Sequence, residues 1–163
     1  MINKKLSLNG LIFKATKINV SNNILTITLN RPEKKNALNN VMVNEINYAL
    51  AYAKQERGIR VVVIAAEGDI FCAGADLNRT ESDSNVPKLD GAEDISIAIR
   101  HLYKPVICKI QGSVLAGALL MVTNATHAIA NKEAEFSAPE IKRGLWPFMV
   151  MAGLFRVMPK RAG

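Results

Sequence analysis

The chain has 163 residues, of which 49% are hydrophobic and 21% are charged, a composition that fits one globular domain and excludes a disordered chain. No apolar run approaches the length of a membrane span, and no apolar signal-peptide segment follows the charged N-terminus, so we expect a cytoplasmic protein without membrane contact. The two cysteines, Cys72 and Cys108, have no metal-ligand spacing; their number allows one disulfide, but we favour free thiols and no metal site.

The net charge of +7 raises the question of an anionic partner. The 21 basic residues are scattered, and no dense basic run is interleaved with aromatic residues. A solvated basic surface is therefore the first interpretation, and attraction of a small anionic ligand such as a nucleotide or coenzyme A is the second. We expect no nucleic-acid partner.

The first elements are a strand and a long helix. Residues 1–22 predict a lead-in segment or a first strand. In residues 25–30 apolar and polar side chains alternate, which predicts a half-buried strand, and Pro32 ends it because proline cannot donate to the ladder. Apolar residues then recur at helical spacing, which predicts an amphipathic helix over residues 39–57 with Asn39 as its N-cap.

The middle of the chain alternates in the same way. Gly58 is the expected stop of the helix, and the β-branched run at residues 61–65 predicts a strand covered on both faces. Residues 78–90 are polar and predict a mobile loop. Apolar spacing at 95–102 predicts a second helix, and residues 106–110 predict another buried strand.

The last elements complete the pattern. Small and apolar side chains at 115–122 predict a buried helix, and residues 127–130 predict a short strand. A final helix is expected over residues 149–158, stopped by Pro159. Strands and helices alternate throughout, so the sequence predicts an α/β fold with parallel strand pairing.

Two segments carry candidate chemistry, and each follows a buried strand. Residues 71–77, Phe-Cys-Ala-Gly-Ala-Asp-Leu, combine small side chains that let a backbone N–H approach a ligand carbonyl. Residues 112–118, Gly-Ser-Val-Leu-Ala-Gly-Ala, open a predicted helix, whose first N–H groups attract negative charge. Taken alone, the first segment reads more simply as a tight turn and the second as close helix packing.

Together these segments resemble the crotonase superfamily of enoyl-CoA hydratases and isomerases. The resemblance runs from about residue 24 onward and also includes residues 29–38 and 136–145, with Ser-Ala-Pro-Glu-Ile at 137–141. It implies a spiral of repeated ββα units, with residues 1–163 as a crotonase-like N-terminal core domain that lacks the C-terminal helical cap. An uncovered core face is then expected to act as an aggregation or partner-binding surface.

The resemblance also implies an acyl-CoA thioester as substrate, with coenzyme A bound as part of it and no separate cofactor. The family's two oxyanion-hole N–H donors match Ala75 and Gly117. Lys34 and Lys35 are candidates for the phosphates, although solvated surface lysines are the simpler interpretation. The stretches matching the binding region for the coenzyme A arm contain Lys35, Ala37, Ala73, Ala75, Asp76 and Leu77.

One glutamate of the family pair is replaced. Family hydratases use two glutamates to orient and activate water; the second matches Glu140, but the first position is Leu120. Leucine can neither hold nor activate water, so we expect an isomerase-like reaction with Glu140 as lone acid/base. Trp146 and Phe148 are expected, with Leu145, to supply an apolar wall beside Glu140; plain core packing explains them about as well. A glutamate paired with Lys142 or Arg143 is the simpler reading of Glu140, but the Pro-Glu motif makes it the less favoured one.

A second function is also open at this point. Leu120 and the absent cap equally fit a non-catalytic acyl-CoA-binding module or an inactive remnant. A homo-oligomer, a trimer or hexamer, is the family habit, but the residues that normally build its contacts lie beyond the matched segments.

Overall fold

The computed structural model describes residues 5–77, 87 and 93–159. Apart from Pro87, the polar loop predicted at 78–90 lies outside the described residues. The α/β class is confirmed, and the described chain forms four successive units of strand, strand and helix. The units are β1 (Thr16–Ser21), β2 (Ile24–Leu29) and α1 (Asn40–Gln55); β3 (Val61–Ala66), β4 (Ile70–Cys72) and α2 (Ile95–Arg100); β5 (Val106–Ile110), β6 (Ser113–Leu115) and α3 (Leu119–Asn124); and β7 (His127–Ala130), β8 (Phe136–Ser137) and α4 (Phe148–Val157). Short 3-10 helices cover Pro32–Lys34 (η1), Ala116–Ala118 (η2) and Pro139–Arg143 (η3).

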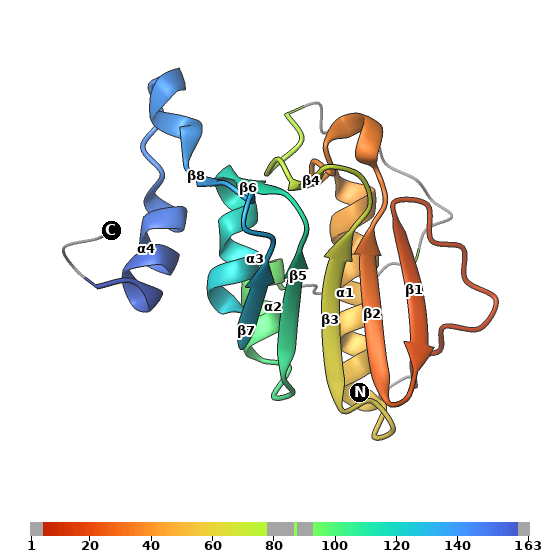
Figure 1. Ribbon diagram of the computed structural model, residues 1–163. Coiled ribbons are helices and arrows are strands. Elements are labelled where there is room, and N and C mark those ends of the chain that lie inside the picture. Colours follow the sequence, from red (N-terminus) through yellow and green to blue (C-terminus); the bar gives the residue numbers. More distant parts are fainter. Residues whose placement is uncertain (1–4, 78–86, 88–92, 160–163) are drawn as a thin grey trace.

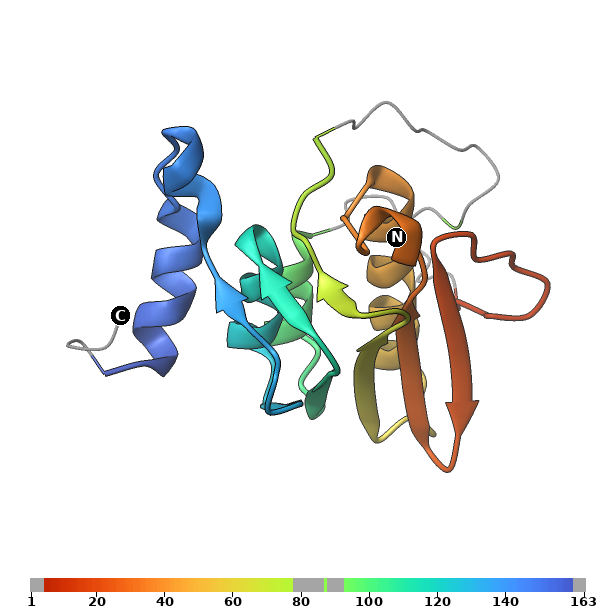
Figure 2. The ribbon, with the colours of Figure 1, turned by 45° about the horizontal axis from the view of Figure 1, so that its top comes forward.

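The strands form two sheets. Both strands of the first unit and the first strand of each later unit form a five-stranded sheet in the order β1-β2-β3-β5-β7, and the second strands of the last three units form a short sheet, β4-β6-β8. All pairs are parallel except β1 with β2. The large sheet faces the viewer in Figure 1, and Figure 2 shows the three short strands side by side. The repeat thus stacks one turn of chain on the next.

The core lies between the large sheet and the row of helices behind it (Figure 1). Leu25, Ile27 and Leu29 on β2 are fully buried, and the intervening Thr26 and Thr28 are half-buried. The same alternation holds in β3, where only every second residue is fully buried. The expectation that this strand is covered on both faces is therefore wrong within the described chain, because helices cover one face of the sheet.

Of the two predictions for residues 1–22, a lead-in segment or a first strand, the structure shows the strand β1. Asn22 and Asn23, with φ of 50° and 64°, form the two-residue turn between β1 and β2, a conformation that asparagine tolerates better than most residues. The fully buried Glu45 of α1 fixes the start of β1: its carboxylate accepts hydrogen bonds from Lys14 N (2.6 Å), Ala15 N (3.0 Å) and Thr16 Oγ1 (2.8 Å). The helix and the hairpin are thereby tied together.

Helix α1 begins as expected and ends early. The Asn39 side chain caps it by accepting from Met42 N at 2.9 Å. The helix ends at Gln55, three residues before the predicted stop at Gly58. Lys104 binds the last turn instead, because its Nζ donates to Ala53 O and, at 2.8 Å, to Glu56 O.

The segment 115–122, predicted as one buried helix, is divided. Its first residue ends β6, a 3-10 turn follows, and α3 begins only at Leu119. The break occurs where Ala116 adopts a left-handed φ of 53°, which interrupts regular structure. This irregular turn sets the geometry of the candidate site.

Candidate active site

The first candidate turn, residues 73–77, follows β4 and is bound to the loop before α1. Leu38 N donates to Gly74 O at 2.8 Å, and Asp76 N donates to Leu38 O at 3.0 Å, so Leu38 and Ala75 form a bridge. Gly74 has a φ of +90°, a conformation that side chains disfavour. Within the described chain, no turn, loop or cap hydrogen bond uses the N–H of Ala75.

Two buried polar side chains hold this turn in place. The Asn36 amide accepts from Arg31 N at 2.8 Å and donates to Glu67 O and Ile70 O, both at 2.8 Å. Arg31 Nη1 donates to Ala37 O at 2.7 Å and pairs with Asp76 Oδ2 at 3.0 Å. Both side chains of the ion pair are largely buried, so loss of either partner would remove a shielded interaction that holds the turn in place.

The second candidate turn, residues 112–118, connects β5 to α3 through β6. A Cβ on Gly112 would lie 1.7 Å from Asp69 O, so only glycine fits this crossing. Ala116 has a left-handed backbone, a conformation that costs an L-residue roughly 1–2 kcal/mol. Gly117 has open space where a Cβ would be, with no heavy atom within 4 Å and no positive φ.

The two turns meet. A Cβ built on Gly74 would lie 2.8 Å from Ala116 Cβ and 3.3 Å from Gly117 N. Segments that are about 40 residues apart in the sequence therefore converge, as expected for the connections after neighbouring strands of one sheet. The structure thus brings together the turns that carry Ala75 and Gly117.

A cavity of about 430 Å³ opens where the turns meet, and Ala75 and Gly117 both line it. Most of its other lining is apolar: Leu38, Val43, Ile95, Leu120, Met121 and Met149. Leu120, the replacement for the first family glutamate, therefore faces the site. Its Cδ2 lies 3.2 Å from where a Cβ on Gly153 would be, so helix α4 closes in behind it.

Sequence reasoning missed the polar part of this cavity. Asn40, Asp94 and Ser96 line it, and Asp94 is the one charged residue among the described residues of the lining. Asp94 caps α2, with Ser96 N and Ser96 Oγ both donating to its Oδ1. An Asp-x-Ser pattern before a helical stretch was the available signal, but it indicates a cap and not a pocket.

Glu140 does not line this cavity. It is the second residue of the 3-10 helix η3, and its Oε2 is buried without a hydrogen-bond partner among the described residues. The apolar wall expected around it is not formed: Leu145, Trp146 and Phe148 are 59%, 56% and 75% exposed. Trp146 and Phe148 pack edge to face against each other instead, with ring centroids 6.3 Å apart.

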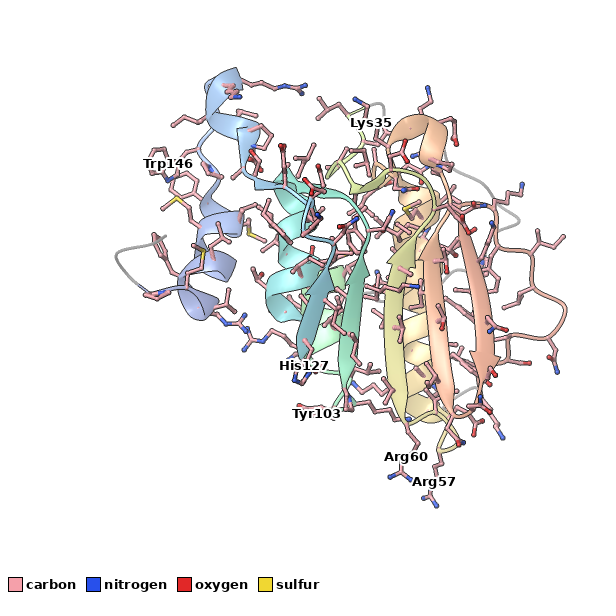
Figure 3. All side chains as sticks on the ribbon, in the orientation of Figure 1. Lys35, Arg57, Arg60, Tyr103, His127 and Trp146 are labelled. Atoms are coloured by element: carbon pink, nitrogen blue, oxygen red, sulfur yellow. The ribbon has the colours of Figure 1, made fainter. Side chains whose placement is uncertain are left out.

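The residues predicted to bind the coenzyme A arm form one strip, which consists of the first turn and the segment 35–37 bonded to it. Ala73 N donates to Lys35 O at 3.0 Å, which joins the two halves of the strip. Lys35 and Leu77 are exposed, whereas the Asp76 carboxylate is engaged by Arg31. Figure 3 shows Lys35 at one end of the large sheet and the basic Arg57 and Arg60 at the other, so these labelled charges do not gather in one patch.

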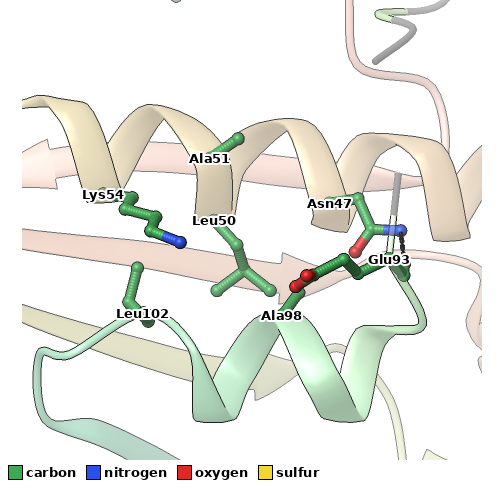
Figure 4. A pocket seen from close by; sticks show the side chains of 7 residues that line it. All are labelled: Asn47, Leu50, Ala51, Lys54, Glu93, Ala98 and Leu102. Carbon is green, nitrogen blue, oxygen red and sulfur yellow. Dashed lines mark hydrogen bonds between the residues drawn. The ribbon is translucent and has the colours of Figure 1, made fainter. Parts of the chain in front are cut away.

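A second cavity, of about 230 Å³, lies between α1 and α2 (Figure 4). Lys54 and Glu93 flank an apolar floor that includes Leu50 and Leu102. Asn47 Nδ2 donates to Glu93 O at 3.0 Å, while its Oδ1 is buried and has no partner in the described part of the chain. This cavity shares no lining residue with the first, so the two turns do not contribute to it.

Metal and membrane chemistry receive no support from the described residues. Within residues 5–77 and 93–159, no three histidine, cysteine or acidic side chains gather as metal ligands. No helix in those ranges is long and apolar enough to cross a membrane.

Comparison with known proteins gives one consistent family. The family model described as enoyl-CoA hydratase/isomerase matches residues 19–163. The mevalonyl-coenzyme A hydratase of Aspergillus fumigatus is 32% identical over 130 residues, which are 75% of this chain and 46% of that protein. The trans-2-decenoyl-[acyl-carrier-protein] isomerase of Streptococcus mutans is 32% identical over 142 residues, 83% of this chain and 54% of the relative.

Solved structures agree. An enoyl-CoA hydratase/isomerase from Mycobacterium paratuberculosis superposes with a TM-score of 0.80 at 28% identity, covering 93% of this chain and 60% of that one. An enoyl-CoA hydratase from Mycobacterium smegmatis has the same TM-score at 29% identity. The crotonase-like fold is therefore confirmed, and the chain spans about half the length of the curated relatives it matches.

Proposed function

Because the chain belongs to the enoyl-CoA hydratase/isomerase family, we propose that it binds an acyl-CoA thioester where the two turns meet. The N–H groups of Ala75 and Gly117 then stabilise the oxygen of the thioester enolate. The supporting observation is that both residues line one cavity although their turns are far apart in the sequence. Fixed backbone donors favour a developing oxyanion over the neutral carbonyl, and losing one such donor typically costs about 10²–10³ in rate.

The coenzyme A arm is proposed to follow the strip made of the first turn and the segment bonded to it. This strip is formed by backbone and side chains of Lys35, Ala37, Ala73, Ala75, Asp76 and Leu77. Exposed Lys34 and Lys35 supply positive charge near the phosphates. The network of Asn36 and Arg31 keeps this strip in one conformation.

The proposed reaction is an isomerisation that moves a proton between carbons of the bound enolate, with Glu140 as the lone acid/base. Two observations favour it over hydration. Leu120 faces the cavity where hydratases of the family need a glutamate, and leucine cannot orient water. Glu140 Oε2 is buried without a partner among the described residues, which is costly, and a catalytic role is one explanation for keeping such a group.

A second candidate function is a non-catalytic acyl-CoA-binding module. The observation in its favour is that Glu140 lies outside the cavity lining in this structure. Under this alternative the two backbone donors still bind the thioester, but no side chain transfers a proton.

Titration with acetoacetyl-CoA, followed by the ultraviolet band of its enolate, tests the proposed binding site. We expect a saturable signal with the 163-residue chain. Gly117→Ala is the variant to compare with the parent chain. Gly117 lines the cavity, and a Cβ added there meets no protein atom within 4 Å, so the substitution should not disturb the fold. It should weaken binding at least about tenfold with an unchanged melting temperature. A folded chain that gives no enolate signal would contradict the proposal.

Glu140→Gln separates the two candidate functions. If Glu140 is the acid/base, enoyl-CoA isomerisation should fall by about 10²–10⁴ while the enolate titration is retained. Glu135→Gln, a change at an exposed residue in the turn between β7 and β8, is the control and should leave turnover unchanged. Acyl-CoA binding without any turnover in the parent chain would instead establish the binding module.

A further inference from the structure

Among the described residues that line the cavity at the two turns, Asp94 alone is ionisable, and its charge is negative. No lysine, arginine or histidine of the described chain lines it. Any group attached to a thioester that is held by Ala75 and Gly117 shares this cavity with the Asp94 carboxylate.

The carboxylate is fixed in position by the start of α2. Ser96 N donates to Asp94 Oδ1 at 2.8 Å, Ser96 Oγ donates to the same oxygen, and Ala98 N donates to Asp94 O at 2.8 Å. Ser96 itself is buried, so Asp94 is anchored on a packed element. A carboxylate anchored in this way cannot swing far from an incoming charge.

We propose that Asp94 is a specificity-determining residue, which makes the site select against acyl groups that end in a carboxylate and in favour of uncharged ones. This inference rests on the proposed acyl-CoA function of the same cavity. Two like charges within one small cavity repel, and the apolar lining formed by residues such as Ile95, Met121 and Met149 offers no compensating cation.

The repulsion acts on the acyl end alone. Coenzyme A itself is anionic, but its phosphates are assigned to the surroundings of exposed Lys34 and Lys35, and neither lysine lines the cavity. An acyl chain that ends in a hydroxyl group is not repelled in this way, because the Asp94 carboxylate can accept a hydrogen bond from it, as it does from Ser96.

Calorimetric titration with hexanoyl-CoA and adipoyl-CoA tests the proposal, because these ligands have equal chain length and differ by one terminal carboxylate. We expect adipoyl-CoA to bind about tenfold more weakly to the parent chain. Asp94→Asn should bring the two affinities within about twofold, since asparagine caps a helix as well as aspartate does and removes only the charge.

Asp69→Asn is the control for net charge, because Asp69 is exposed and does not line the cavity. It should leave the tenfold preference intact. Equal affinities of the parent chain for hexanoyl-CoA and adipoyl-CoA would overturn the proposed role of Asp94 but not the proposed function. A preference that Asp94→Asn leaves unchanged would do the same. Failure of both ligands to bind a folded chain would overturn the proposed function together with the role of Asp94.

Discussion

The N-terminal region, residues 14–77, and the C-terminal region, residues 127–159, differ in how far polar groups are hydrogen-bonded and apolar groups are buried, although Asn47 Oδ1 in the N-terminal region is also buried without a partner among the described residues. In the N-terminal region, fully buried Glu45 accepts three hydrogen bonds, and the Asn36 amide is bonded on both sides. In the C-terminal region, Glu140 Oε2 is buried without a partner among the described residues, while Trp146 and Phe148 are exposed.

This difference separates the residues that stabilise the fold from the residue proposed for proton transfer. The N-terminal region supplies most of the buried hydrophobic residues of the core, whereas only one side of α4, through Val150 and Gly153, packs against the rest. Figures 1 and 2 show α4 at the margin of the molecule, beyond β7. Substitutions should therefore cost most stability in the N-terminal region, and the Glu140 substitution should cost activity with little stability.

The largest expected contrast is between two glutamates. Glu45→Ala leaves two backbone N–H groups and one hydroxyl without their acceptor in a buried site, and should lower the free energy of unfolding by about 3–5 kcal/mol. Glu133→Ala removes a side chain that is 77% exposed and whose ion pair within the described chain is with Lys132, so it should change stability by less than about 0.5 kcal/mol. Urea unfolding measures both, and equal losses would show that the regions do not differ as argued.

Two glycines, one in each region, allow the stability costs of the same substitution to be compared. Gly74 and Gly144 both have a left-handed backbone, with φ of +90° and +71°. Gly144→Ala meets open space and should cost only the backbone strain, about 1 kcal/mol. Gly74→Ala adds a contact of 2.8 Å to Ala116 Cβ, so it should cost about 3 kcal/mol in all and abolish acetoacetyl-CoA binding.

The excess cost at Gly74 isolates the packing between the two turns, because the backbone term is nearly common to both glycines. Thermal unfolding of the two variants gives this difference directly. Similar stability losses would mean that the turns are free to separate, and Ala75 and Gly117 would then not be held as a pair.

Most elements could be predicted because their signal is local. The alternation in residues 25–30 and the helical spacing from Asn39 onward are written in the chain itself, and β2 and α1 follow them closely. The approach of the two turns was expected only through the family resemblance, since each motif alone also describes an ordinary turn.

The remaining features of the site depend on long-range contacts, which the periodicity of the sequence does not predict. Ala116 bends the backbone where the composition indicated a continuous helix, because the close approach of Gly74 fixes the turn. Asp94 enters the cavity only because α2 packs beside α3, and Glu140 stays outside the lining because η3 projects from the edge of the short sheet. Such long-range placement is invisible to periodicity.

Two buried thiols should make the stability of the fold depend on pH. Cys72 and Cys108 are the only cysteines, and neither lies in the C-terminal region. Burial raises the pKa of Cys72 to about 12, and burial likewise raises the pKa of Cys108 to about 12, from an ordinary 9.0. Above pH 9 the unfolded chain therefore loses thiol protons that the folded chain keeps. Stability should fall as the pH rises from about 9 toward 12, by about 1.4 kcal/mol per pH unit for each thiol.

Cys108→Ala provides the matched variant for this pH dependence. Urea unfolding at pH 8 and pH 10 should show a loss of stability that is about 1.4 kcal/mol smaller in the variant than in the parent chain. The constant cost of removing the sulfur cancels, because each protein is compared with itself at two pH values. An identical loss in both proteins would mean that the thiol ionises as easily folded as unfolded, and the packing around β5 would then be looser than its burial indicates.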